Sequence, residues 1–164
     1  MAYQFLGQTV IPQKAADTST TKKVPLGQTV QAMDPTFGTS QFIYVQASNS
    51  IAQYDAVAIK PGYKIAPLTI TNGKLAIEVA FSQVAVGTKG DYVWVIQGGR
   101  PLVRCANGTQ PNVPLFATAT GGVLDDVSSS VVIQGVMTET QVTNSAGTAT
   151  CVARFPTAHH EPPG

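Results

Sequence analysis

The strongest constraint on the fold is a succession of short apolar runs from Phe42 to Phe155, most of them ended by a turn rich in glycine, proline or asparagine. No stretch of ten or more residues has the 3.6-residue apolar period of a helix. Two pairs of runs have the spacing of a β-hairpin: residues 91–96 with 101–105 through a Gly-Gly connection, and residues 131–137 with 148–155. The sequence therefore predicts an all-β fold, a single antiparallel β-barrel or β-sandwich domain of about eight strands.

The first 40 residues lack this regular pattern. Three prolines and a polar stretch interrupt them, although they also carry scattered apolar side chains. A segment of this composition does not form a core by itself. We therefore expect an extended N-terminal arm over residues 1–40, a β-rich body over residues 41–157 and a flexible C-terminal tail over residues 158–164.

Charged side chains are scarce. Asp, Glu, Lys and Arg make up 12% of the 164 residues and nearly cancel to a net charge of +1, whereas an average soluble domain has roughly 25% charged residues. Without basic clusters or an apolar run of membrane-helix length, we expect no direct nucleic-acid partner and no membrane partner. A surface with so few like charges has little to keep it monomeric, so we expect much of it to be covered in an assembly.

No set of catalytic or metal-binding side chains stands out. His159 and His160 are the two histidines, and both fall in the predicted tail, where adjacent residues rarely complete a coordination sphere. Asp125 and Asp126 follow a Gly-Gly pair, which is typical of turn-forming aspartates, with acid–base chemistry or calcium binding as the alternative. We therefore expect no catalytic, cofactor-binding or metal site, and a protein that is not an enzyme.

The cysteines and one aromatic strand each allow two interpretations. Cys105 and Cys151 fall in separate predicted strands, and we expect buried free thiols, although two cysteines also allow one disulfide. Tyr92 and Trp94 alternate with valines, so we expect one set of these side chains to face the core and the other to face outward or into an interface. For the two aromatic residues the prediction is core packing, with a stacking platform for sugars or bases as the alternative.

Three segments follow one another in a suggestive order. They read Ala-Met-Asp-Pro-Thr-Phe-Gly at 32–38 leading into Gln-Phe-Ile-Tyr-Val at 41–45, then Gly-Asp-Tyr-Val-Trp-Val-Ile-Gln-Gly-Gly at 90–99, then Asn-Val-Pro-Leu-Phe-Ala-Thr-Ala-Thr-Gly-Gly-Val-Leu-Asp-Asp at 112–126. In this pattern the chain, over roughly residues 28–156, resembles the head decoration (cement) proteins of tailed bacteriophages. The resemblance implies a structural virion protein without cofactor or active site. Such a protein binds the outer surface of an expanded capsid and bridges neighbouring copies of the major capsid protein against the pressure of packaged DNA.

The arm supplies the candidate contacts for such a role. Its apolar side chains can each be buried against a neighbour at about 25 cal/mol per Å², and many copies on one shell add avidity. We expect deletion of residues 1–25 to abolish capsid binding and to leave the body folded. The candidate residues for capsid or subunit contact are Tyr3, Phe5, Leu6, Val10, Ile11, Lys22, Lys23, Leu26, Val30 and Phe37.

The expected partners are the major capsid protein and the chain itself, as a homo-oligomer in which a trimer is favoured over a dimer. The first eight residues lack the features of a secretory signal, so we expect synthesis in the host cytoplasm and a final location on the outer capsid surface of the virion. One alternative is a receptor- or glycan-binding module of a virion fibre or tail, using outward aromatics such as Tyr92 or Trp94. Another is a cellular β-barrel subunit of a larger complex.

Overall fold

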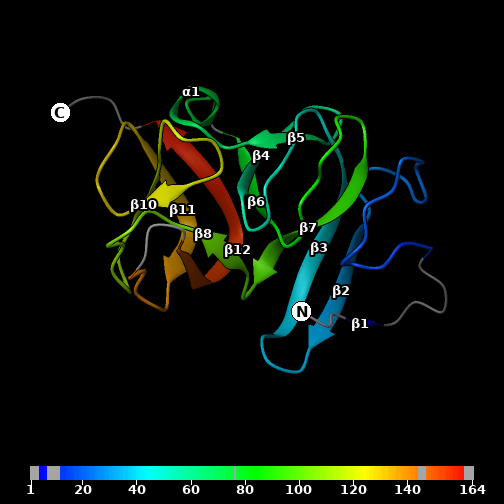
Figure 1. Ribbon diagram of the computed structural model, residues 1–164, viewed down its shortest axis with the longest axis horizontal. Coiled ribbons are helices and arrows are strands. Elements are labelled where there is room, and N and C mark those ends of the chain that lie inside the picture. The colour runs from blue at the N-terminus through cyan, green and yellow to red at the C-terminus, as the bar shows by residue number, and fades with distance from the viewer. Residues whose placement is uncertain (1–3, 7–11, 76, 144–146, 161–164) are drawn as a thin grey trace.

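The computed structural model in Figure 1 describes residues 4–6, 12–75, 77–143 and 147–160. The protein is nearly all β, with 50% of it in strands and 3% in helix, so the predicted all-β class is confirmed. The described helix is α1 (Ile70–Gly73), which the Thr69 side chain caps by accepting from the Asn72 N–H. The strands are β1 (Gln4–Leu6), β2 (Thr29–Asp34), β3 (Gly38–Ala47), β4 (Ala56–Lys60), β5 (Lys64–Pro67), β6 (Glu78–Ser82), β7 (Tyr92–Gly99), β8 (Leu102–Arg104), β9 (Leu115–Ala117), β10 (Leu124–Asp125), β11 (Val131–Thr138) and β12 (Thr148–His160).

The strands join in one mixed sheet that bends strongly. The pairings run from β3 to β5, β4, β6 and β7, and β7 pairs with β3 again, so these five strands form a closed circuit. β12 then carries the sheet from β6 and β7 to β11, β9 and β10 (Figure 1). The β3–β5 pair is parallel. The expectation of a purely antiparallel sheet is therefore wrong at that pair.

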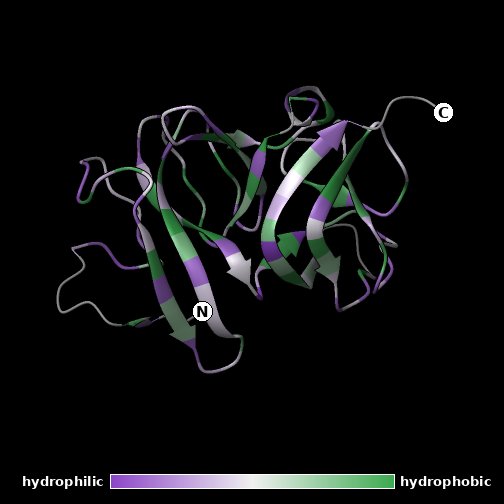
Figure 2. Ribbon diagram, turned by 180° about the vertical axis from the view of Figure 1, so that it is seen from behind, coloured by the Kyte–Doolittle hydropathy of each residue, from purple (hydrophilic) through white to green (hydrophobic). Residues whose placement is uncertain are grey.

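Strands with two buried faces separate three apolar clusters. In β7, Val93 and Val95 face one cluster while Trp94 and Ile96 face another, because successive side chains of a strand point to opposite sides. The expectation that one of these sets faces outward or into an interface is therefore wrong, since both are buried within the chain. Figure 2 shows apolar and polar residues succeeding one another along the long strands. The central cluster is enclosed by the circuit, an N-terminal cluster lies on the outer side of β3 and β7, and a C-terminal cluster lies between β4, β6, β12 and β11.

Much of the predicted arm packs on the chain's own body. β2 pairs with β3 along its whole length, and its alternate residues Val30 and Ala32 are buried in the N-terminal cluster. Ala15 is buried in the same cluster, and Val24 and Leu26 pack against it. The arm is therefore not extended away from the body between residue 12 and residue 40. The body needs these apolar side chains to cover β3 and β7.

One predicted hairpin is confirmed and the other is wrong. β11 and β12 pair antiparallel, as predicted, although residues 144–146 between them lie outside the described residues. β7 and β8 follow one another, but β8 pairs with β12 and not with β7. β12 also runs to His160, which pairs with Val131, so the tail prediction is wrong for residues 158–160. Residues 161–164 lie outside the described part.

Candidate functional site

Tyr63 is an exposed aromatic side chain in the turn between β4 and β5. Lys60 and Lys64 form the last pair of that hairpin, and the three residues between them include Gly62 and Tyr63 at φ 76° and 56°. A tyrosine at positive φ is uncommon, because its Cβ crowds the backbone there. The ring lies directly over Gly27, where a Cβ would overlap it. The turn thus holds the ring in a fixed place while leaving 43% of the residue exposed.

Phe155 is exposed for a different local reason. The register of β11 and β12 shifts between the pairs Gln134–Thr157 and Val136–Ala153, which leaves an extra stretch of β12 opposite Gly135. Such a bulge re-aims a side chain. Phe155 has φ 48° within it and is 59% exposed.

The two aromatic residues line one hollow. It has a volume of about 330 Å³, and we name it the aromatic hollow. Its polar side chains include Glu78 and Gln97, whose Oε2 and Nε2 atoms are 3.4 Å apart. Its lining is Gly27, Thr29, Ile43, Tyr63, Glu78, Gln97, Phe155, Pro156 and Thr157.

Two further hollows adjoin the aromatic hollow. One of about 770 Å³ shares Tyr63 and Glu78 with it and includes Lys60 and the exposed Leu75. The other, of about 410 Å³, shares Phe155 and lies over β2, β3 and β7. The three hollows therefore lie next to one another, and Tyr63 and Phe155 at their borders sit in a backbone conformation that bulky residues avoid. Such outliers persist only where the surrounding structure imposes them, and they concentrate at functional sites.

A row of side chains with little charge crosses the sheet, and part of it lines the hollow of about 410 Å³. Leu6 pairs with Gln31, Gln31 with Gln41, Gln41 with Gly98, and Gly98 with Arg154. We name this row, together with Met33, the outer sheet face. Leu6 and Met33 are 41% and 44% exposed, and Arg154 is its one charged residue.

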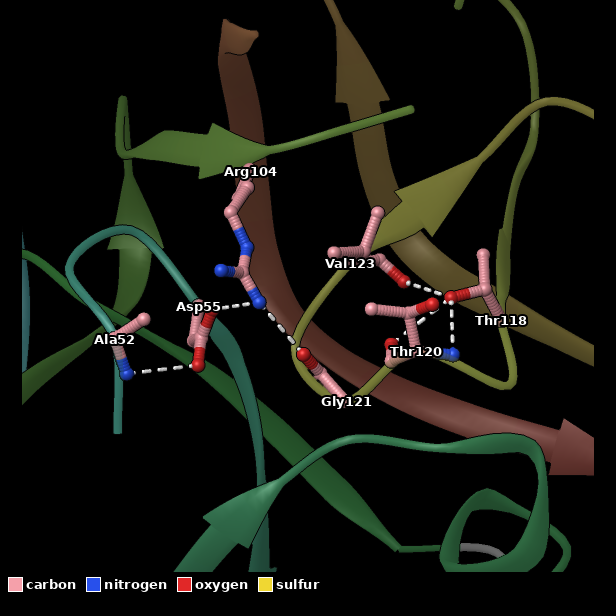
Figure 3. A network of polar contacts seen from close by, with 7 residues as sticks. All are labelled: Ala52, Asp55, Arg104, Thr118, Thr120, Gly121 and Val123. Carbon is pink, nitrogen blue, oxygen red and sulfur yellow. Dashed lines mark hydrogen bonds and ion pairs between the residues drawn. The ribbon is translucent and has the colours of Figure 1, made fainter. Parts of the chain in front are cut away.

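An ion pair joins the residue before β4 to the last residue of β8 (Figure 3). Arg104 Nη2 lies 2.8 Å from Asp55 Oδ1 and donates to the Gly121 carbonyl at 2.7 Å. Asp55 Oδ2 accepts from the Ala52 N–H at 2.9 Å. A Cβ on Gly122, which has φ 77°, would overlap the Asp55 carboxyl. The network therefore ties the start of β4 to β8 and to the loop before β10.

Burial dominates the charge state of Asp55. Its side chain is 3% exposed, and this desolvation raises the pKa of the carboxyl above its usual value. The Ala52 N–H and the Arg104 guanidinium lower the pKa, but by less. The contacts of Asp55 and Arg104 thus connect three segments of the chain, and we call this network the Asp55–Arg104 joint.

A second network is buried under the N-terminal segment. The Tyr44 hydroxyl donates to Gln13 Oε1 at 2.7 Å, and Trp94 Nε1 donates to the Gln13 carbonyl at 3.1 Å. The Tyr44 and Tyr92 rings stack with centroids 6.0 Å apart. Trp94 is fully buried and Tyr92 packs against the same cluster, so the predicted core packing is confirmed and the stacking platform is wrong. Burial also raises the pKa of Tyr44.

The residues predicted to contact the capsid or another subunit lie in different parts of the structure. Leu6 lies on the outer sheet face, and Lys22 and Lys23 are exposed. Leu26 and Val30 belong to the N-terminal cluster, and the half-buried Phe37 lies in the β2–β3 turn. The structure does not bring these residues together at one surface. Tyr3, Val10 and Ile11, and the side chain of Phe5, lie outside the described residues.

The remaining candidates keep structural roles. Asp125 Oδ1 accepts from the Asp126 N–H at 2.8 Å, and Asp126 Oδ2 accepts from the Gln110 N–H at 2.9 Å, as predicted for turn formers. Cys105 and Cys151 are buried free thiols, as predicted, and the Cys105 thiol together with burial raises the pKa of Cys151. Among the described residues, no three His, Cys, Asp or Glu side chains gather as metal ligands would.

Sequence reasoning did not single out Tyr63 or Phe155. Two local signals were available, the Pro-Gly pair before Tyr63 and the proline that follows Phe155 inside an apolar run. Both mark turns or bulges. Neither signal indicates that the two side chains meet, because their proximity depends on β12 pairing with β6 and β7.

Comparison with known proteins found no relative of this chain. No protein-family model matches the chain, and no curated protein matches it. Within the described ranges, no helix has the length and hydropathy that crossing a membrane requires.

Proposed function

We propose that the protein is a structural virion component that binds the outer surface of a tailed-phage capsid and cements neighbouring major capsid protein subunits. The outer sheet face is the observation that carries this proposal. It presents Leu6 and Met33, each more than 40% exposed, beside glutamines and a single arginine. A surface of this kind can be covered by a partner without stripping water from many charges.

The contact surface proposed here is a sheet face to which residues 1–40 contribute Leu6, Gln31 and Met33, in place of an extended arm. Burial of exposed apolar area contributes about 25 cal/mol per Å², and repeated copies on a shell add avidity to a modest single contact. The residues from Gln13 to Val30 support this face from behind by filling the N-terminal cluster. Deletion of residues 1–25 would therefore uncover Trp94 and Tyr44, contrary to the expectation that the body stays folded.

The finer architecture belongs to the same proposal. We infer that the closed circuit of β3, β5, β4, β6 and β7 is a small β-barrel, to which β12, β11, β9 and β10 add a second layer. The closure of the pairings and the apolar cluster inside them support this inference. A barrel leaves few free strand edges, so lateral contacts between copies are made through faces.

Capsid binding can be tested with a surface variant. Leu6→Ser combined with Met33→Ser should reduce co-sedimentation with expanded capsids of the phage that encodes the chain at least tenfold. Val127→Ser is the matched control, because Val127 is 68% exposed but lies outside the outer sheet face. Undiminished binding of the double variant, or absence of the chain from purified virions by mass spectrometry, would refute the proposal.

The oligomeric state is tested separately. Light scattering of the isolated protein should give the mass of a homo-oligomer, with a trimer expected. A monomeric mass at the concentrations that saturate capsids would contradict the predicted homo-oligomer. It would not bear on the capsid contact, which the co-sedimentation experiment tests.

A further inference from the structure

The aromatic hollow has the shape of a small-molecule site. Its volume of about 330 Å³ falls in the range of ligand pockets, roughly 300–1,000 Å³. Tyr63 and Phe155 line it from two segments far apart in the sequence, one from a turn and one from a bulge. Since both backbones are held at positive φ, the side chains are placed before any ligand arrives, which lowers the entropy lost on binding.

The polar lining indicates the class of ligand. Glu78, Gln97 and Thr157 supply carboxylate, amide and hydroxyl groups, which can accept from and donate to hydroxyl groups of a ligand. Glu78 is the one charged residue of the hollow, and Lys60 in the adjoining hollow carries the opposite charge. A ligand that matches this lining is uncharged, rich in hydroxyls and has apolar C–H faces that can lie on the aromatic rings.

We propose that the aromatic hollow binds a neutral carbohydrate, with Tyr63 and Phe155 as stacking surfaces and Glu78, Gln97 and Thr157 as hydrogen-bonding groups. The adjoining hollow of about 770 Å³, which continues past Tyr63 and Lys60, gives room for further sugar units of a chain. This site goes beyond the proposed capsid contact and does not depend on it, because Tyr63 and Glu78 lie outside the outer sheet face.

The proposal is tested by calorimetry with maltohexaose, cellohexaose, chitohexaose and xylohexaose as probes. At least one of these oligosaccharides should bind the full-length protein. Tyr63→Gly and Phe155→Gly should each weaken that binding at least tenfold, since glycine keeps the positive φ and removes the ring. Val127→Gly, at an exposed apolar residue that lines none of the three hollows, should leave the affinity unchanged.

A second variant tests Glu78 as a hydrogen-bonding group. Glu78→Gln replaces a charged acceptor by a neutral amide of the same shape, so affinity for the bound probe should fall by roughly threefold to tenfold, because a hydrogen bond to a charged group is about twice as strong as a neutral one. An unchanged affinity of the Glu78 variant would overturn the assigned role of Glu78, and no binding of any probe, or equal binding by the Tyr63 and Phe155 variants, would overturn the proposal. Leu6→Ser with Met33→Ser should leave sugar binding intact, so the two proposals fail or stand separately.

Discussion

Tyr63 and Phe155 line one hollow, and both hold a positive φ, 56° in the β4–β5 turn and 48° in the β12 bulge. Neither residue is buried enough to compensate for this conformation by core packing, since 43% and 59% of their surfaces are exposed. The fold therefore keeps two strained aromatic residues at a surface, where glycine or asparagine would fit the backbone better.

The free energy of unfolding of a glycine variant shows whether an aromatic residue at these positions is required for folding. Phe155→Gly should change the free energy of unfolding by less than about 1 kcal/mol, because relief of the left-handed strain, roughly 1–2 kcal/mol, offsets the entropy cost of glycine and the lost contacts. Urea unfolding followed by Trp94 fluorescence measures this change. The fully buried Phe81 provides the contrast, since Phe81→Ala should cost about 3–5 kcal/mol. A loss above about 2 kcal/mol for Phe155→Gly would show that Phe155 supports the core.

The Asp55–Arg104 joint predicts that Asp55→Ala destabilises the protein more than Asp55→Asn does. Asp55→Ala removes the acceptor of the Ala52 N–H and leaves Arg104 without its anion. The expected loss is about 2–3 kcal/mol, below the roughly 3–5 kcal/mol of a fully buried pair, because the Arg104 side chain is 32% exposed. Asp55→Asn keeps an acceptor and should cost less. Chemical denaturation of both variants tests the order, and an equal or larger loss for Asp55→Asn would contradict it.

The raised pKa of Asp55 also sets the direction of a pH dependence. Between the unfolded-state value, about 3.9, and the higher value in the folded protein, the folded state holds a proton that the unfolded chain has released. The stability from this group is therefore full below the unfolded value and is lost as the pH rises through the folded one. Unfolding free energies of wild type minus Asp55→Asn, measured from about pH 3 to about pH 7, should decrease with pH. A difference that grows with pH would refute this assignment.

The sequence predicted those features of the fold that depend on local periodicity. The short apolar runs at residues 91–96 and 131–137 placed β7 and β11 correctly, because strand formation follows from side chains close together in the sequence. It did not predict the partner of each strand. The Gly98-Gly99 pair looked like a hairpin turn, whereas both glycines belong to β7, and Gly99 at φ 120° lets Ser40 approach closely.

Long-range contacts also explain why the sequence did not predict the packing of residues 13–26 or the aromatic hollow. Residues 13–26 have no strand-like pattern, yet they are ordered because the exposed side of β3 and β7 needs a cover. That this side requires a cover can be inferred only when Phe42, Tyr44 and Trp94 are known to lie on the same face of the sheet. The aromatic hollow likewise arises where β12 meets the β4–β5 turn, and no local sequence window contains both segments.

Gln13 offers a direct test that the N-terminal segment belongs to the body. Its side chain accepts from the Tyr44 hydroxyl and donates to the Asp17 and Tyr92 carbonyls at 2.9 and 3.0 Å. Gln13→Ala leaves the Tyr44 O–H without this buried acceptor, so the protein should lose about 1–3 kcal/mol of unfolding free energy.

The matched control for Gln13→Ala is Gln134→Ala on β11, because Gln134 is exposed and its removal should change stability by less than about 0.5 kcal/mol. Urea unfolding followed by Trp94 fluorescence measures both variants, and the signal reports directly on the cluster that Gln13 covers. If Gln13→Ala were as stable as Gln134→Ala, the segment around Gln13 would not be part of the cooperative fold. The outer sheet face would then lose its support from the N-terminal cluster, and a freely extending arm would again be the better account of capsid contact.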